Sequence, residues 1–462
     1  MQRKQTNLEQ ETLISGELET NDRYGKGRAL PMQHQEARQI ATTSNLLEAI
    51  LSRENMLNAL KKVRTNKGSA GIDNMTTDEL PDYLKSKWQE IRQKITEGKY
   101  KPSPVKRVEI PKDGGGKRML GIPTVLDRMI QQAISQKLVE VYDSEFSGHS
   151  YGFRPGRSAH QAVKQSKAYI ETGYDNIIDL DIEKFFDRVN HDYLMSRIAS
   201  KIADKKLLLL IRRYLQAGIM EQGIIRITEE GTPQGSPLSP ILSIILLDEL
   251  DKELEKRGHR FVRYADDCTI YVRTVRAAER IKESISVFLK KRLKLQLNEE
   301  KSGVRKPDEV RVLGYGFLRN RKGEWKIRIS KKAKAKLKKK VKSITSRRLP
   351  VSVTERIRKI NIILRGWGNY FKLTELPNDF KDIDGWIRNR LRICHWKNWK
   401  LVKTRIRELK SLGISEANAI RWGHSRKGYA RVANSKILKL SLTNTYFRSL
   451  GCFELAKLQV VN

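Results

Sequence analysis

Residues 261–272, Phe-Val-Arg-Tyr-Ala-Asp-Asp-Cys-Thr-Ile-Tyr-Val, carry the pattern around which this chain is organised. Two runs of β-favouring residues, 261–264 and 268–272, flank Ala265, Asp266 and Asp267. This pattern predicts a strand, a tight turn and a returning strand, with two carboxylates at the turn. Adjacent carboxylates repel each other unless a cation is near, and a pair of Mg²⁺ ions acting on a phosphate needs such a cluster. Asp is also common in exposed turns, so this stretch alone leaves a plain hairpin turn open.

A second acidic strand is expected in residues 177–187, Ile-Ile-Asp-Leu-Asp-Ile-Glu-Lys-Phe-Phe-Asp. Because side chains alternate along a strand, Asp179 and Asp181 should share one face while the neighbouring aliphatic residues share the other. Acid on one side of an apolar strand is costly without a cation. The two segments together predict one metal site built from distant strands.

These segments carry a family resemblance. Residues 264–267 resemble the YxDD box of reverse transcriptases, and residues 181–186 resemble their upstream catalytic block. The implied catalytic residues and metal ligands are Asp181, Asp266 and, less directly, Asp267, with the backbone carbonyl of Ile182 as a further ligand. The family gives no comparable role to Asp179, which is a weaker candidate. The implied cofactor is a pair of Mg²⁺ ions, and Mn²⁺ also accepts carboxylate ligands.

Four more residues match nucleotide contacts of that family. Lys112 and Arg118 lie beside the Gly-rich tip of a hairpin predicted over residues 105–122, where they could clamp a triphosphate or form a solvated turn. Phe186, five residues after Asp181, matches the steric gate against ribonucleotides, although Phe is usually a core residue. Gln234, in a segment rich in Gly and Pro, matches a contact to the incoming nucleotide.

Charge indicates a polyanionic partner. The formal net charge is +39, and residues 321–462 hold 37 Lys and Arg against 9 Asp and Glu, with six of the seven Trp. Nucleic acid is favoured over a membrane surface, because no basic amphipathic helix with an apolar aromatic face stands apart from a core.

The chain has no apolar run of about 18 residues, no signal-peptide core and no paired-cysteine spacing, so a cytoplasmic location is expected.

The C-terminal part narrows the resemblance to group II intron enzymes. Residues 364–371, Leu-Arg-Gly-Trp-Gly-Asn-Tyr-Phe, resemble the thumb, or X, domain of their maturases. Residues 66–76 resemble their extra N-terminal block, and residues 151–155, Tyr-Gly-Phe-Arg-Pro, recur in these enzymes, where they could line the nucleotide pocket or support its wall. From these segments and the cation-indole mixture of residues 388–400, the predicted RNA or DNA contacts are Lys67, Arg154, Arg365, Trp367, Arg388, Arg392, Trp396, Lys397 and Lys400.

The resemblance, over about residues 45–440, implies an α+β right-hand polymerase with an antiparallel palm sheet, followed by an α-helical thumb. The expected parts are a polar, mobile extension (1–43), fingers and palm (44–320), thumb or X domain (326–400), and a small basic DNA-binding-like region (401–462) without an HNH endonuclease.

The implied function is RNA-directed DNA synthesis combined with binding of the protein's own intron RNA, which assists splicing and intron mobility. Its partners would be intron RNA, template RNA, primer or target DNA and dNTPs in a bacterial cytoplasm. Two alternatives stay open: a splicing factor whose polymerase site has decayed, and a free-standing reverse transcriptase of defence or diversity-generating type. The oligomeric state is also open, a dimer included.

Overall fold

The computed structural model describes residues 44–111, 115–221, 224–226 and 230–459. The predicted N-terminal extension, residues 1–43, and the predicted triphosphate contact Lys112 lie outside these ranges.

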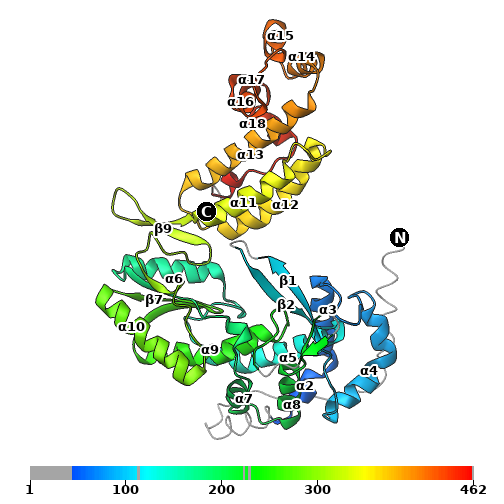
Figure 1. Cartoon of the computed structure of the whole chain (residues 1–462), viewed down its shortest axis with the longest axis vertical. Helices are drawn as coiled ribbons and strands as arrows, with labels where there is room; N and C mark the ends of the chain where they lie inside the picture. The colour runs from blue at the N-terminus through cyan, green and yellow to red at the C-terminus, as the bar shows by residue number, and fades with distance from the viewer. Residues whose placement is uncertain (1–43, 112–114, 222–223, 227–229, 460–462) are drawn as a thin grey trace, which may run out of the picture.

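A four-stranded palm sheet has the strand order β6-β7-β3-β8, and its strand β7 lies between α6 and α10 in Figure 1. Its strands are β3 (Asn176–Leu180), β6 (Arg260–Tyr264), β7 (Asp267–Val272) and β8 (Gly303–Arg305). All three pairings are antiparallel, which confirms the antiparallel palm expected from the sequence.

The two faces of the palm sheet are packed against different layers. Ile178 and Phe261 belong to a first hydrophobic core that includes helices α9 (Ser239–Lys256) and α10 (Val275–Phe288). Ile177 and Tyr271 belong to a second core, shared with α6 (Ala159–Glu171) and the C-terminal helices. Asp179 is paired with Thr269, so it lies on this second face, as alternation along the strand requires.

A second sheet, in the order β2-β1-β4-β5, lies beside the palm. Its strands are β1 (Val105–Pro111), β2 (Lys117–Ile122), β4 (Ile219–Glu221) and β5 (Ile224–Arg226). The hairpin predicted over residues 105–122 is therefore present, with Arg118 opposite Ile110 in the register. The surrounding helices are α2 (Leu46–Ile50), α3 (Arg53–Asn66), α4 (Leu80–Thr96), α5 (Val125–Tyr142), α7 (His191–Ala199) and α8 (Lys205–Leu215).

The C-terminal part is helical after one hairpin, β9 (Tyr315–Arg319) and β10 (Trp325–Ile329). Its helices are α11 (Lys331–Ile344), α12 (Val353–Phe371), α13 (Pro377–Asn398), α14 (Val402–Ser411), α15 (Glu416–Gly423), α16 (Tyr429–Asn434), α17 (Lys436–Ser441) and α18 (Asn444–Ser449). Helices α11–α13 stand next to the palm, and α14 and α15 lie farthest from it (Figure 1). None of the helices described is both long and apolar enough to cross a membrane.

Candidate active site

The Tyr-Ala-Asp-Asp segment forms the turn between β6 and β7. Tyr264 is paired with Asp267, so Ala265 and Asp266 form a two-residue loop. Ala265 has a φ of +58°, in the left-handed region that tight hairpin turns require. A side chain in that region costs about 1–2 kcal/mol, so neighbouring residues must hold the turn in place.

An open cleft of about 960 Å³ lies between the palm and the C-terminal helices. Asp179, Asp181 and Asp267 line its palm side, so the structure brings together acidic residues from β3, the segment after it and the turn. Lys332, Lys336 and Lys340 of α11 line the opposite side. The cleft therefore has an acidic wall facing a basic wall.

The acidic wall is electrostatically strained. Desolvation and, after it, the negative charges of Asp266, Asp179 and Asp181 raise the pKa of Asp267 to about 6. The side chain of Asp267 nevertheless reaches solvent, and repulsion from the neighbouring carboxylates contributes to this raised pKa beside desolvation. Burial also raises the pKa of Asp179. Oδ2 of Asp179 lies 3.7 Å from Nε of Arg305.

Asp181 is ion-paired with a lysine that the sequence did not single out. Nζ of Lys301 lies 3.1 Å from Oδ2 of Asp181, and both side chains are partly exposed. An exposed pair of this kind contributes only about 0–1 kcal/mol. A divalent cation could therefore displace the lysine at little cost.

The donor atoms of this wall suit a hard divalent cation, because they are carboxylate oxygens that repel one another. Among the described residues, no three side chains of His, Cys, Asp or Glu are grouped so that they could hold a metal ion. Asp181 and Asp267 line the cleft and Asp266 precedes Asp267 in the turn, so these three residues could hold such an ion if their side chains reorient. Ile182, predicted to contribute its carbonyl, is buried and follows Asp181 directly in the chain.

A smaller pocket of about 240 Å³ joins the base of the β1-β2 hairpin to two of the predicted nucleotide contacts. Phe186 and Gln234 both line it, together with Arg107. Backbone hydrogen bonds connect these segments: the amide of Thr232 donates to the carbonyl of Phe186 (2.6 Å), and that of Gly121 donates to the carbonyl of Gln234 (2.8 Å). Phe186 is only partly buried, which distinguishes it from the enclosed Phe185.

Three predicted nucleic-acid contacts are enclosed by the protein, and we withdraw them. Trp396 is 1% exposed and lies in the second core. The guanidinium of Arg392 donates to the carbonyl of Leu442 and lies over the ring of Phe447. The guanidinium of Arg154 is held by Asp143 and by the carbonyls of residues 147 and 150, so it supports the wall of the site.

The other predicted contacts keep at least part of their side chain accessible. Lys67, Arg365 and Lys400 are exposed, and Lys397 is partly exposed beside Tyr429. Trp367 lines the cleft while packing against Phe371. Arg388 is mostly buried and lies 3.7 Å from Glu454.

The basic wall of the cleft was missed in the sequence. The run of lysines at 331–340 is typical of a solvated helix face, yet Lys332, Lys336 and Lys340 recur every four residues and share one side of α11. That spacing was the available signal. Lys301 had no such signal, because it is 120 residues from Asp181.

Comparison with known proteins supports the resemblance to reverse transcriptases that the sequence shows. The family model described as reverse transcriptase (RNA-dependent DNA polymerase) matches residues 110–317, and the group II intron, maturase-specific domain matches residues 334–413. Protein YkfC of Escherichia coli (strain K12) is 30% identical over 325 residues, covering 62% of this chain and 85% of that protein.

Two intron-encoded proteins are also similar. Group II intron-encoded protein LtrA of Lactococcus lactis subsp. cremoris is 31% identical over 331 residues, covering 57% of this chain and 55% of LtrA. The putative COX1/OXI3 intron 2 protein of Saccharomyces cerevisiae is 37% identical over 207 residues, covering 44% of this chain and 24% of that protein. The chain therefore spans about half of LtrA and a quarter of the yeast protein.

The palm sheet, the Tyr-Ala-Asp-Asp turn and the match over residues 110–317 define a reverse transcriptase, an RNA-directed DNA polymerase. Within that class, the chain belongs to the group II intron-encoded reverse transcriptases that carry a maturase-specific domain.

Proposed function

We propose that this chain extends a DNA primer along an RNA template in the cleft between the palm and α11, and that its C-terminal helices bind the intron RNA and assist splicing. The observation that carries the proposal is the cleft itself, where the acidic wall faces lysines at four-residue spacing. Cations on that side suit the phosphates of a template-primer duplex, and carboxylates opposite suit the reacting end.

The metal ligands of this proposal are Asp181, Asp266 and Asp267, with the carbonyl of Ile182 as a further ligand. Two bound Mg²⁺ ions, or Mn²⁺ in their place, would supply activation of the primer hydroxyl and charge neutralisation at the triphosphate. The chain's own contribution is to hold three carboxylates on two adjoining segments. Lys301, released from Asp181, would remain as a cation at the rim of the cleft.

The incoming dNTP is proposed to lie near the pocket between the β1-β2 hairpin and Phe186. Phe186 would exclude a 2′-hydroxyl by contact with the sugar, and Gln234 would contact the nucleotide from the facing segment. Lys112 and Arg118, which the sequence predicts beside a Gly-rich turn, would add positive charge near the triphosphate.

The intron RNA is proposed to contact a basic pocket of about 460 Å³ at the far end of α11. We define this basic pocket by Lys339, Lys342, Ser343, Ser346, Arg347, Arg348 and Arg390. It contains five cations and two hydroxyls and no acidic residue, a composition that suits phosphate. Together with exposed Lys400 and Arg365, it replaces the enclosed residues as the proposed RNA surface. The protein would act with RNA and DNA in a bacterial cytoplasm.

Replacement of one carboxylate tests the polymerase. Asp266→Ala should reduce primer extension by at least about 10³-fold, because the loss of several kcal/mol of metal-assisted charge stabilisation is expected. Affinity for intron RNA should stay unchanged, since Asp266 is not among the residues that line the basic pocket. The matched control is Asp82→Asn, at a side chain that is 79% exposed on α4. Extension that persists in Asp266→Ala would rule out the metal assignment.

Splicing tests the second activity. The flanking intron RNA should excise faster at low Mg²⁺ when the protein is present, and Asp266→Ala should assist equally well. Excision that is unaffected by the protein, with primer extension intact, would instead identify a free-standing reverse transcriptase.

A further inference from the structure

A buried arginine lies directly beneath the catalytic turn. Arg263 of β6 and Asp251 of α9 are each 0% exposed. Nε of Arg263 donates to Oδ1 of Asp251 at 2.6 Å, and Nη2 donates to the other carboxylate oxygen. On β6, Arg263 points toward α9 while Tyr264 points toward the cleft, as strand alternation requires.

The remaining nitrogen of the guanidinium reaches the turn. Nη1 of Arg263 donates to the carbonyl of Ala265 at 3.0 Å. Ala265 is the residue with the unfavourable positive φ, and its carbonyl belongs to the peptide that leads into Asp266. A strained conformation persists only where its surroundings determine it fully. The planar guanidinium of Arg263 thereby connects helix α9 to the peptide that orients the carboxylate of Asp266.

Residues 147–154 hold the other side of the same strand. The amide of Arg263 donates to the carbonyl of His149, and the amide of Tyr151 donates to the carbonyl of Arg263, each at 2.9 Å. Gly152 lies so close to the turn that a Cβ there would be 2.4 Å from the nitrogen of Ala265.

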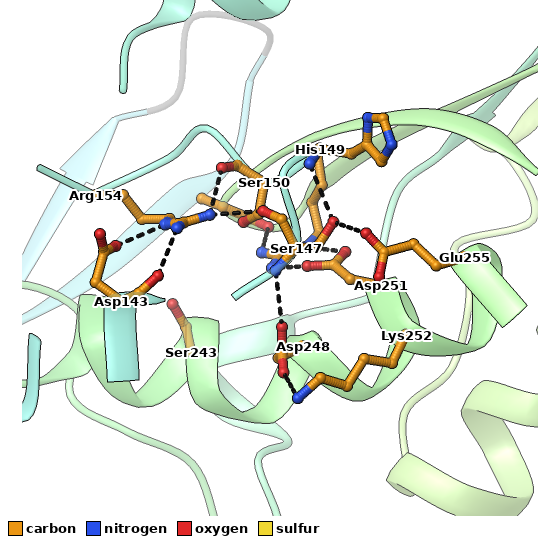
Figure 2. A network of polar contacts seen from close by, with 12 residues as sticks. Asp143, Ser147, His149, Ser150, Arg154, Ser243, Asp248, Asp251, Lys252 and Glu255 are labelled. Carbon is orange, nitrogen blue, oxygen red and sulfur yellow. Dashed lines mark hydrogen bonds and ion pairs between the residues drawn. The ribbon is translucent and has the colours of Figure 1, made fainter. Parts of the chain in front are cut away.

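Helix α9 and Arg154 anchor this segment in turn. Figure 2 shows Asp248 and Glu255 of α9 directed at Ser147, and Arg154 bridging Asp143 and the 147–150 backbone. The turn is therefore enclosed between Arg263 and the residue 147–154 segment, and both are tied to α9.

A role in stability alone does not account for the ion pair. Desolvation of two charges offsets most of their attraction. Apolar residues of similar volume can commonly replace such a pair without loss of folding stability. What apolar residues cannot supply is a donor to the Ala265 carbonyl.

We propose that Arg263 is a positioning residue, which Asp251 orients and which sets the backbone of the Ala265–Asp267 turn, whose Asp267 carboxylate lines the cleft. The positioning is a property of the metal-free protein. Only its catalytic consequence rests on the proposed polymerase function.

The test compares an apolar replacement of the pair with a matched core variant. Arg263→Met combined with Asp251→Leu removes both charges together, so neither is left buried and unpaired. Leu254→Ala, also on α9 and 0% exposed, is the control that destabilises the core without touching the turn. Amide hydrogen exchange of the metal-free proteins is followed in residues 264–268 and in β3.

In the double variant, exchange in the turn should speed up at least tenfold relative to β3, and kcat should fall more than tenfold with a smaller change in KM for dNTP. Leu254→Ala should change neither the exchange of the turn relative to β3 nor kcat relative to KM. A folded double variant whose turn is protected as in the parent would overturn the proposal.

Arg263→Lys is the second variant, and it serves if the double variant does not fold. Lysine keeps the charge but lacks the planar fork that reaches Asp251 and Ala265 at once, so the same loosening of the turn is expected. Parent-like exchange and kcat in Arg263→Lys would overturn the proposal. A loosened turn in a chain whose parent lacks polymerase activity would support positioning while rejecting the proposed function.

Discussion

Asp267 combines an exposed side chain with a crowded electrostatic environment. Three other carboxylates, those of Asp179, Asp181 and Asp266, contribute to its raised pKa, after desolvation. Asp179 lies near the cation of Arg305, and Asp181 is ion-paired with Lys301. A cation bound beside Asp267 would reduce the repulsion from these three carboxylates.

Replacing this carboxyl should change the pH dependence of stability. The folded-state pKa of Asp267, about 6, lies above its ordinary value of 3.8, so the folded protein binds more protons than the unfolded chain between these values. Stability is then lost as the pH rises through 6. Asp267→Asn should raise the unfolding temperature of metal-free protein by roughly 1–2 °C at about pH 7.5 and by less at about pH 4.5, as followed by calorimetry. An equal gap at both pH values would contradict the raised pKa.

Phe186 and Phe185 are adjacent but differ in exposure, which allows a direct comparison. If Phe186 lies under the sugar, Phe186→Val should increase ribonucleotide use relative to dNTP use by about 10–200-fold, the range for one steric contact in a pocket. Primer extension with matched NTP and dNTP measures the ratio. Phe185→Val, in the core, should lower stability and leave the ratio unchanged. An equal ratio of ribonucleotide to dNTP use in the two variants would show that Phe186 packs within the protein and does not exclude the 2′-hydroxyl.

The segment from Ser147 to Arg154 acts as a support for the β6-β7 hairpin. It runs along β6, the edge strand of the palm sheet, and is bridged to it between Ser150 and Arg263. The Tyr-Gly-Phe-Arg-Pro motif thereby acquires a structural explanation: glycine permits close approach to the turn, and arginine holds the segment's carbonyls. Phe153, by contrast, is 52% exposed.

Gly152→Ala should damage the turn because the clash involves backbone atoms. The added Cβ would lie 2.4 Å from the Ala265 nitrogen and 3.0 Å from the Tyr264 carbonyl carbon, and neither atom can rotate away. A loss of about 1–3 kcal/mol of stability and at least tenfold slower extension are expected. Gly148→Ala in the same segment meets no heavy atom within 4 Å and serves as the control. Unfolding midpoints and extension rates that match between the two variants would contradict this packing.

The second hydrophobic core extends across the predicted domain boundaries. The second core joins palm residues such as Val163 and Tyr271 to Leu364 and Ile387 of the C-terminal helices. Deleting residues 326–462 would expose that palm surface and affect folding and RNA binding together. Surface substitutions are the better test, and the division at residues 320–326 and 400–401 stays a prediction.

Neutralising the basic pocket should weaken RNA binding in a salt-dependent way. Replacing Lys339, Lys342 and Arg348 with Gln removes three charges, which should reduce the slope of log affinity against log salt by about 2 if each contacts a phosphate. Replacing the exposed Lys85, Lys87 and Lys94 of α4 removes the same charge elsewhere and should leave most of the slope intact. Filter binding of intron RNA over a salt series measures both. Equal slopes for the two triple variants would exclude the pocket as the RNA surface.

The amino-acid sequence by itself determined the local features of this protein. The Asp266-Asp267 hairpin, the shared face of Asp179 and Asp181 and the β1-β2 hairpin all follow from alternation and turn chemistry within a few residues. The class followed as well, because the catalytic segments occur in order along the chain.

Only the tertiary structure decided which charged residues face solvent. Lys301 joins Asp181 across 120 residues, and Arg392 meets the Leu442 carbonyl across 50, so no local pattern could reveal either contact. Arg154, Arg392 and Trp396 looked like nucleic-acid contacts because composition does not report burial. Arg263 adjoins the catalytic motif in sequence, yet its partner comes from α9, and the packing of that helix against the palm sheet makes the arginine part of the turn.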